Sequence, residues 1–243
     1  MVKIKTVIAA GGLGKRLIGY KGNDKTKVLL EVNGTAMINQ QIKQLSSWGL
    51  SDFTVITNPT YDKLIRDVTS ELGSSITLNF EVQNKPLGIS HALSKAKPQI
   101  KGDEVIILML GDNFFGNNPL KKVDFEKIYN YGGCHIFSIK VPNPSEFGIA
   151  EIDLKNNVLN IEEKPADPKS NNAVVGLYVF DKNALNNISK LKPSLRGEYE
   201  ITDLIEIYIN QNLCTHSSIE SWWIDAGTPE RVKDLENKLS DNI

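Results

Sequence analysis

Apolar and polar residues alternate along this chain with two different periods, and the period changes from one segment to the next. Apolar residues recur at helical spacing across residues 36–48, 61–72 and 90–97. Between these segments lie strand-like runs, over residues 2–10, 53–57, 76–82 and 105–110. Strands that alternate with helices in this way are typical of a largely parallel sheet with helices on both faces. Residues 105–110 are apolar throughout, which predicts the centre of the sheet.

The second half of the chain is richer in strands and in turns. Helical spacing covers residues 201–210, and Thr228-Pro229-Glu230 has the composition of a helix start. Strand-like runs cover residues 136–141, 148–152, 158–162, 174–180, 213–219 and 222–225, and a short apolar run in the first half covers residues 28–32. Turn-rich pieces separate most of them, so we expect antiparallel additions to the sheet. The predicted fold class is therefore α/β, with three α/β/α layers around a mixed, mainly parallel sheet and one domain over residues 1–243.

Composition narrows the class of protein further. Hydrophobic residues make up 40% and charged residues 23% of the chain, which is ordinary globular usage. The formal net charge of -1 provides no basic field for nonspecific nucleic-acid binding. No stretch approaches the roughly 18 consecutive apolar residues of a membrane span, and no leader pattern opens the chain, so we expect a cytoplasmic location and no membrane partner. Cys134 and Cys214 lie in apolar runs and are expected to be reduced core residues.

The run Gly11-Gly-Leu-Gly-Lys-Arg-Leu17 directly follows the first strand and is the strongest candidate for chemistry. Glycines let backbone N–H groups converge on an anion, and Lys15 and Arg16 add positive charge beside them. An ordinary glycine-rich turn is the plain alternative. A Walker loop is excluded, because Gly14-Lys15 is followed by Arg16 and the earlier glycine is Ala9. A dinucleotide loop stays open but is disfavoured, because its third glycine is Leu17 and an irregular segment replaces the helix.

A third interpretation is a loop that wraps a nucleoside triphosphate, with Lys27 as a further cation. On this point the chain resembles the sugar-1-phosphate nucleotidyltransferase family, whose opening pattern Gly-x-Gly-Thr-Arg-Leu is followed by Pro-Lys or Ser-Lys and an apolar strand. Lys15 replaces the usual Thr, and Thr26 the usual Pro or Ser. Further matches follow in the family's order: Gln83 with Pro86-Leu87-Gly88, Gly111-Asp112-Asn113, Phe147-Gly148-Ile149, Glu163-Lys164-Pro165, Gly176-Leu177-Tyr178, Arg196-Gly197-Glu198 with Glu200-Ile201-Thr202-Asp203, and Trp223-Ile224-Asp225-Ala226-Gly227-Thr228. The Gly-Asp-Asn and Glu-Ile-Thr-Asp forms look most like the glucose-1-phosphate thymidylyltransferase branch.

The resemblance implies a Rossmann-like nucleotidyltransferase fold that binds the nucleotide with residues 1–115 and the sugar phosphate with residues 116–243. The implied reaction transfers a nucleotidyl group from a nucleoside triphosphate, dTTP or UTP, to a sugar 1-phosphate such as glucose 1-phosphate. No general base is required, because a phosphomonoester with a second pKa of about 6 is already largely a dianion. Two alternatives remain: a noncatalytic relative that binds nucleotide sugars, and an NAD-dependent dehydrogenase. Assembly into a homo-oligomer is left open.

Residue roles follow from the same resemblance. Asp112 and Asp225 each follow or end a strand, and as a pair they are expected to hold Mg2+. Arg16 is expected to clamp the triphosphate and Lys27 to stabilise charge at the α-phosphate. The other expected contacts are Gly11, Gly12, Gly14, Gln83 and Gly88 for the nucleotide, and Asn113, Gly148, Glu163, Lys164, Val174 and Arg196 for the sugar phosphate. The histidines and Trp222–Trp223 are expected to be structural.

Overall fold

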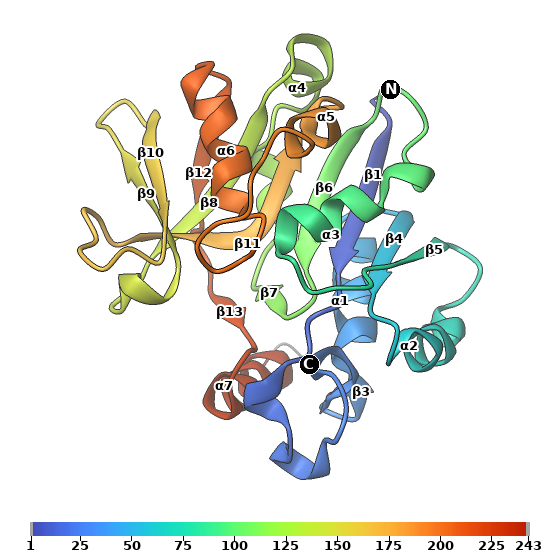
Figure 1. Ribbon diagram of the computed structural model, residues 1–243. Coiled ribbons are helices and arrows are strands. Elements are labelled where there is room, and N and C mark those ends of the chain that lie inside the picture. The colour runs from blue at the N-terminus through green and yellow to red at the C-terminus, as the bar shows by residue number, and fades with distance from the viewer. Residues whose placement is uncertain (1, 242–243) are drawn as a thin grey trace.

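The computed structural model describes residues 2–241, which form a mixed nine-stranded sheet with helices on both faces (Figure 1). The main strand order is β10-β9-β11-β6-β1-β4-β5, and β8 and β12 extend from β11 on a second branch. The predicted α/β class and its mixed central sheet are confirmed.

Four strands of the first half form the parallel part of the sheet. β1 (Ile4–Ala9) pairs with β4 (Asp52–Thr57) on one side and with β6 (Val105–Leu110) on the other, and β5 (Thr77–Val82) pairs with β4. All three pairings are parallel. The carboxyl ends of these strands therefore meet at one edge of the sheet, where α/β proteins bind their ligands.

The strands of the second half add to this sheet through β11 (Asn172–Phe180), which lies antiparallel to β6. β11 also pairs antiparallel with β8 (Cys134–Lys140) and β9 (Gly148–Ile152), and β9 pairs with β10 (Val158–Glu163). β12 (Cys214–Ser218) pairs parallel with β8. The register of β11 against β8 shifts between Val174 and Tyr178, so β11 bulges around Gly176. The expected antiparallel additions are confirmed.

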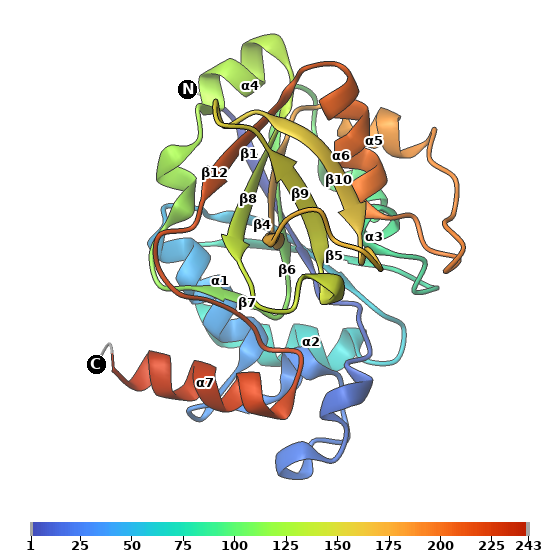
Figure 2. The ribbon, with the colours of Figure 1, turned by 90° about the vertical axis from the view of Figure 1, so that its left-hand side faces the viewer.

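Helices lie on both faces of the sheet, as Figure 2 shows, and alternate residues of the central strands pack toward the two helical layers. Ile106 and Leu108 of β6 pack toward α3 (Ile89–Lys95), α5 (Ala184–Ile188) and α6 (Ile201–Asn210). Ile107 and Met109 pack toward α1 (Met37–Ser47), α2 (Asp62–Thr69) and α4 (Phe125–Tyr131). Since both faces of β6 are buried, its uniformly apolar sequence is explained.

A third, smaller core lies below the strand ends. The last helix, α7 (Pro229–Ser240), packs Val232 and Leu235 against Leu17 and Val32 of the N-terminal segment. Just before it, β13 (Trp223–Asp225) pairs antiparallel with β7 (Asn113–Phe115), the short strand that follows β6. This ribbon and helix connect the end of the chain to its first loop.

Three predictions for local structure were wrong or incomplete. Residues 27–29 form a 3-10 turn, and only β2 (Glu31–Val32) is extended, paired with β3 (Thr35–Ala36), so Lys27 does not start a strand. Hydrogen bonds from Leu29 and Leu30 back to residues 26 and 27 close this turn. The helices α4 and α5 were missed; each has fewer than eight residues, which is too short for a clear helical period.

Two expectations about core and membrane can be compared with the model. Cys134 and Cys214 are both free thiols and lie opposite each other on β8 and β12, but only Cys134 is buried, so Cys214 is not a core residue. Within residues 2–241 no helix has the length and apolar character needed to cross a membrane. The cytoplasmic location and the single-domain division stay predictions.

Candidate active site

Two cavities meet at the carboxyl edge of the parallel strands, and their linings include most of the candidate residues. The first, of about 310 Å³, is lined by the glycine loop, Lys27, Gln83, Gly88 and Asp112. The second, of about 170 Å³, is lined by Gly148, Glu163, Lys164 and Val174. Arg16, Asn113 and Asp225 line both cavities. Of the predicted site residues, Gly14 and Arg196 line neither.

Side chains from neighbouring segments form hydrogen bonds with the backbone of the glycine loop. Asn58 Nδ2 donates to the Gly11 carbonyl at 3.1 Å, and Thr26 Oγ1 donates to the Gly12 carbonyl at 2.6 Å. Gly14 has a φ of +60°, and a Cβ there would lie 2.6 Å from Lys27 Cβ. Gly14 therefore does not line the cavity but leaves room for Lys27. Thr26, which departs from the family pattern, fixes the position of the loop through the hydrogen bond from its hydroxyl to the Gly12 carbonyl.

No α-helix directly follows the glycine loop. Lys15–Leu17 forms a single 3-10 turn, and Ile18 at its end is extended. A dinucleotide-binding loop presents its glycines at a helix N-terminus, which this segment lacks. The dinucleotide alternative therefore loses its structural basis. Lys15 and Arg16 are both exposed, and of the two only Arg16 lines the cavities.

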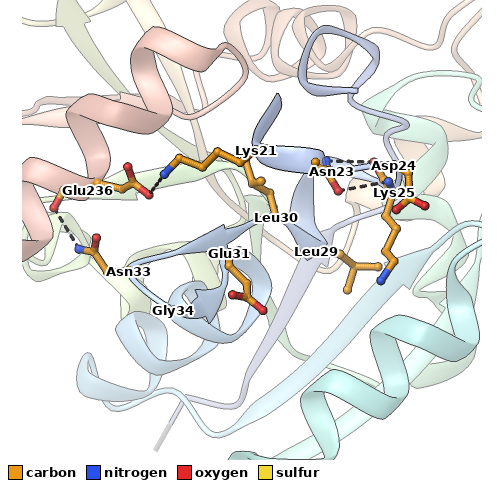
Figure 3. Close-up of a pocket in the computed structure, with 11 residues that line it drawn as sticks. Lys21, Asn23, Asp24, Lys25, Leu29, Leu30, Glu31, Asn33, Gly34 and Glu236 are labelled. Carbon is orange, nitrogen blue, oxygen red and sulfur yellow. Dashed lines mark hydrogen bonds and ion pairs between the residues drawn. The ribbon is translucent and has the colours of Figure 1, made fainter. Parts of the chain in front are cut away.

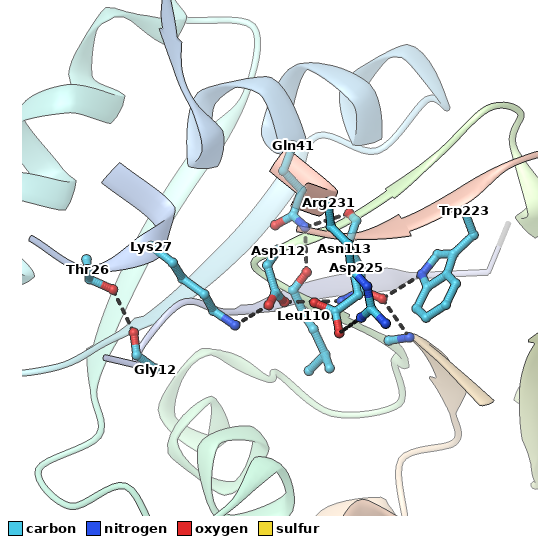
Figure 4. Close-up of polar contacts among 11 residues, drawn as sticks. Gly12, Thr26, Lys27, Gln41, Leu110, Asp112, Asn113, Trp223, Asp225 and Arg231 are labelled. Carbon is cyan, nitrogen blue, oxygen red and sulfur yellow. Dashed lines mark hydrogen bonds and ion pairs between the residues drawn. The ribbon is translucent and has the colours of Figure 1, made fainter. Parts of the chain in front are cut away.

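Asp112, which is buried, and Asp225, whose side chain is 22% exposed, form a carboxylate pair at the junction of the two cavities (Figure 4). Asp112 follows the end of β6 and Asp225 ends β13, and each carboxyl group shifts the pKa of the other. Lys27 Nζ forms an ion pair with Asp112 Oδ2. On the other side, Arg231 Nη1 lies 3.5 Å from Asp225 Oδ2. Two carboxylates are thus flanked by two cations.

The pair is electrostatically asymmetric. Burial, followed by the charge of Asp112, raises the pKa of Asp225 to about 6. Burial opposes ionisation of Asp112 too, but the charge and hydrogen bond of Lys27, with further hydrogen bonds from Asp225 and Asn113, hold its pKa below the usual value. As the pH falls, Asp225 therefore takes up a proton before Asp112 does. A bound cation would offset the repulsion between the two carboxylates.

The residues present fit a magnesium ion. Asp225 Oδ1 is buried and has no hydrogen-bond partner among the described residues. A Cβ added to Gly227 would lie 2.9 Å from that oxygen and 3.7 Å from Asp112 Oδ2, so Gly227 leaves space beside both carboxylates. In the described part of the chain no cluster of three or more His, Cys, Asp or Glu side chains is placed to hold a metal. Two protein oxygens suit Mg2+, which usually keeps waters and binds substrate phosphates.

Asn113 supports Asp112 more directly than it serves the sugar site. Its Nδ2 donates to Asp112 Oδ1 at 3.1 Å. Its Oδ1 accepts from Gly176 N at 2.9 Å and from Trp223 Nε1 at 2.7 Å. Gln41 Nε2 of α1 donates to the carbonyls of residues 110 and 113, at 2.5 Å and 3.1 Å. Trp223 and Gln41 therefore help to fix the site; Trp223 was expected to be structural, whereas nothing in its local sequence distinguished Gln41.

At the far end of the first cavity the orientation of the Gln83 amide is fixed. Gln83 Nε2 donates to the Gly88 carbonyl at 3.1 Å and contacts His91 Nδ1 at 2.9 Å. A carbonyl can only accept, so the amide nitrogen must face Gly88 and His91, and the Gln83 oxygen is left for another donor. Gly88 has a φ of +99°, and a Cβ there would lie 2.6 Å from the Tyr199 carbonyl. His91 thus contacts a candidate base-binding residue, which the sequence did not indicate.

The second cavity has charged and hydroxyl side chains, Glu163, Lys164 and Thr202, among apolar ones. Burial raises the pKa of Glu163, and the nearby Glu200 adds to this, while Lys164 and Arg196 oppose it. Lys164 has a φ of +47°, an uncommon conformation for a residue with a side chain. Thr202 is buried, and its Oγ1 has no partner among the described residues. Thr202 is therefore a further candidate contact, which only its place in the Glu-Ile-Thr-Asp motif indicated.

Arg196 lies behind this cavity and forms an ion-pair network. Its guanidinium lies 3.2 Å from Glu163 Oε1, 2.8 Å from Glu198 Oε2 and 3.4 Å from Glu200 Oε1. In this arrangement it contacts Glu163 rather than the cavity itself. The expected direct contact of Arg196 with the sugar phosphate is therefore not supported by its position.

A separate cavity of about 500 Å³ lies beside the loop over residues 18–25 (Figure 3). It contains no predicted site residue. Lys21 at its edge forms an ion pair with Glu236 of α7, and Asn33 Nδ2 donates to the Glu236 carbonyl at 3.0 Å. These contacts anchor the segment after the glycine loop to α7.

Comparisons with known proteins agree with this geometry. A family model described as nucleotidyl transferase matches residues 5–242. Over 235 residues the chain is 34% identical to the low-salt glycan biosynthesis nucleotidyltransferase Agl11 of Haloferax volcanii, covering 94% of this chain and 64% of the relative. It is also 35% identical, over an alignment of 235 residues, to a glucose-1-phosphate thymidylyltransferase of Neisseria gonorrhoeae. That alignment covers 94% of this chain and 80% of the relative.

Solved structures give the same result. A Bacillus anthracis crystal structure, provisionally described as a glucose-1-phosphate thymidylyltransferase in complex with a sucrose, superposes with a TM-score of 0.85 at 33% identity. The match covers 99% of this chain and 96% of that one. A UDP-glucose pyrophosphorylase complexed with UDP-glucose has a TM-score of 0.83 at 19% identity over the full length of both chains, which shows the common fold. The chain belongs to the sugar-1-phosphate nucleotidyltransferase family.

Proposed function

We propose that this chain is a glucose-1-phosphate thymidylyltransferase, which transfers a thymidylyl group from dTTP to glucose 1-phosphate and releases pyrophosphate. The observation that carries the proposal is the Asp112–Asp225 pair, which lies between a cavity lined by the glycine loop and Gln83 and a cavity lined by Glu163 and Lys164. The choice of substrates follows the thymidylyltransferase relatives at 33–35% identity. Such a reaction supplies nucleotide sugars for polysaccharide biosynthesis.

In the proposed reaction an oxygen of the sugar 1-phosphate attacks the α-phosphorus of the nucleotide. A new P–O bond forms there, and the bond from the α-phosphorus to the oxygen bridging it to the β-phosphate breaks, so that pyrophosphate leaves with the electron pair. The attacking oxygen needs no base, because the phosphate is mostly dianionic at pH values above its second pKa of about 6. Catalysis must therefore overcome repulsion between anions and hold them in line.

The charged residues suit this task. Arg16 lines both cavities and could bridge phosphate oxygens with its planar guanidinium. Lys27 pairs with Asp112 in the free protein, and the remaining N–H donors of its ammonium group could bind phosphate. Mg2+ bound by Asp112 and Asp225 would supply further neutralisation of phosphate charge. Glu163 can accept a sugar hydroxyl, and Lys164 can bind the sugar phosphate.

The fixed amide of Gln83 bears on the choice of base. Its oxygen, left free by the contacts of Nε2 with Gly88 and His91, requires an N–H donor on the ligand. Thymine and uracil carry such a donor at their ring imide, whereas cytosine carries one only at its exocyclic amino group. We expect dTTP as the substrate and UTP as the second candidate, because the matching relatives include thymidylyltransferases.

The test is pyrophosphate release from dTTP, UTP and CTP, each combined with glucose 1-phosphate and other sugar 1-phosphates, in Mg2+ and in EDTA. We expect the highest kcat/KM with dTTP and glucose 1-phosphate, and no release in EDTA. Preference for UTP would change the nucleotide but keep the reaction class. If no pair releases pyrophosphate while nucleotide sugars still bind, the chain is a noncatalytic relative.

A further inference from the structure

Arg231, in the first turn of α7, connects three groups that belong to different parts of the site. Its Nη2 lies 3.3 Å from Glu146 Oε2, and its Nη1 lies 3.5 Å from Asp225 Oδ2. Its guanidinium carbon lies 5.2 Å from the centre of the Phe147 ring, a cation–π distance. Its backbone N–H also donates to the helix-capping Thr228 Oγ1. One side chain therefore joins α7, the metal-site strand β13 and the segment that precedes β9.

The segment joined in this way carries the sugar-phosphate site. Residues 144–147 lead directly into Gly148, which lines the second cavity with Glu163 and Lys164. The Phe147 carbonyl accepts from Lys164 N at 3.0 Å, so the backbone of this segment also determines where Lys164 lies. The Phe147 ring packs edge-on against Trp223, with ring centres 5.7 Å apart. The position of Phe147 is thus coupled to the sugar-phosphate residues and to the β7–β13 ribbon.

Arg231 itself does not line either substrate cavity. It lies in a separate cavity of about 260 Å³ behind Asp225, bounded by residues 139–143, Phe147 and Asp234. Figure 4 shows its guanidinium next to the Asp225 carboxylate. A cation placed there cannot contact the substrates without moving, but it can hold the 144–147 segment against the metal-site strand. This position fits a positioning role for Arg231 rather than a catalytic one.

We propose that Arg231 is a positioning residue that fixes the 144–147 segment on Asp225, so that the sugar 1-phosphate is held in line with the α-phosphate. This inference rests on the proposed function, since it assumes that the second cavity binds the sugar phosphate. Loss of Arg231 releases Glu146 and Phe147 from β13 and removes a positive charge from beside Asp225, but it leaves the glycine loop untouched. The effect on KM therefore falls on the sugar 1-phosphate, whereas the lost charge beside Asp225 lowers kcat.

The main variant is Arg231→Met, which keeps much of the apolar stem and removes the guanidinium. We expect its KM for the sugar 1-phosphate to rise about 5- to 20-fold, with the KM for the nucleotide within about twofold of wild type. Arg231→Lys retains charge without the planar fork, so it should recover only part of the loss. Glu146→Gln should raise the same KM by a smaller factor, and it provides the test if Arg231→Met does not fold.

Arg66→Met is the matched control. Arg66 on α2 also pairs with a carboxylate, Asp62 at 2.8 Å, and lies 4.5 Å from the centre of the Phe80 ring, but it lines neither substrate cavity. Both KM values of Arg66→Met should stay within about twofold of wild type. Unchanged sugar-phosphate KM in Arg231→Met and Glu146→Gln, or an equal rise in both KM values, would overturn the proposal.

A second measurement separates this proposal from the proposed function. Amide hydrogen exchange over residues 144–148 in the free protein should be faster in Arg231→Met than in wild type, and unchanged in Arg66→Met. Unchanged exchange in this segment would refute the fixing role whatever the activity. If the wild type releases pyrophosphate with no substrate pair but exchange responds as expected, the proposed function fails and the structural role of Arg231 stands.

Discussion

The two cavities at the strand ends are built in different ways. The first is shaped largely by backbone: Gly11, Gly12 and Gly88 border it, and Gly14 leaves room for Lys27. The second is bordered largely by side chains, with the charged Glu163 and Lys164 among apolar residues in its lining and with Arg196 and Arg231 behind. A substitution that adds volume beside the backbone should disrupt the first cavity. A substitution that removes a charge should disrupt the second. The two should therefore fail for different reasons, and Asp225, which lines both, should affect both.

Replacing Asp225 with Asn should have the largest effect, because both cavities depend on it. We expect turnover to fall by at least about 1000-fold as a metal ligand is lost. Without metal, the same change should stabilise the fold. Ionised Asp225 is disfavoured by burial and by Asp112, and the rise in its pKa from 3.8 to about 6 corresponds to a cost of about 3 kcal/mol.

The sign of this stability change depends on pH. Because the folded pKa of Asp225 is raised, wild-type stability falls as the pH rises from about 4 through about 6, relative to the Asn variant. Urea unfolding in EDTA should therefore show the variant more stable at pH 7.5 and nearly equal at pH 4. Near-wild-type turnover, or a variant less stable at pH 7.5 by several kcal/mol, would contradict the role assigned to this residue.

Gly14→Ala tests the backbone-shaped cavity. The added Cβ would lie 2.6 Å from Lys27 Cβ, and φ is +60°, so the loop and Lys27 must shift. We expect the nucleotide KM to rise about 10- to 100-fold, and the sugar-phosphate KM to stay within about threefold. Gly34→Ala is the control for φ alone, because Gly34 has a φ of +72° with open space around it. A similar loss in both variants would show that backbone strain, not the contact with Lys27, is responsible.

Glu163→Gln tests the second cavity. The change keeps the shape and removes the charge that pairs with Arg196 at 3.2 Å. We expect the sugar-phosphate KM to rise about tenfold with the nucleotide KM nearly unchanged. Glu151→Gln, which removes an ion pair with Lys169 at 3.6 Å outside both cavities, should leave both KM values unchanged. An effect of Glu163→Gln on the nucleotide alone would reverse the assignment of the two cavities.

The smallest effect is expected for Lys15→Thr, which restores the family's usual residue in the glycine loop. Lys15 is exposed and contributes only screened charge. Turnover should persist, with the nucleotide KM raised less than about threefold and the difference reduced at high salt. Abolished turnover would show that the loop binds phosphate by its lysine rather than by its backbone.

The sequence predicted the first cavity better than the second, for a physical reason. Backbone-shaped features come from contiguous residues, so the run from Gly11 to Leu17 and the segment around Gly88 could be identified directly. Periodicity also located the apolar strand β6 and the amphipathic helix α6 at their observed bounds. These elements are specified by their own residues, whatever surrounds them.

Contacts between distant side chains could not be predicted in the same way. Arg231 and Glu146 are far apart in sequence, and each alone is an ordinary surface residue. The same holds for the contact of His91 with Gln83. Arg196 was expected at the sugar phosphate, but its three acidic neighbours hold it against Glu163, and that competition depends on the folded geometry.

The β7–β13 ribbon also links activity to the order of folding. It pairs Asn113 with Asp225, residues roughly 110 positions apart, so it closes a long loop and is expected to form late. Until it forms, the chain has the glycine loop and Asp112 but lacks the second carboxylate. During refolding, nucleotide-dependent Mg2+ binding should therefore appear after the far-ultraviolet circular dichroism signal of the sheet. A partly folded chain would then be unable to consume nucleotide, so catalytic activity would appear only after folding is complete.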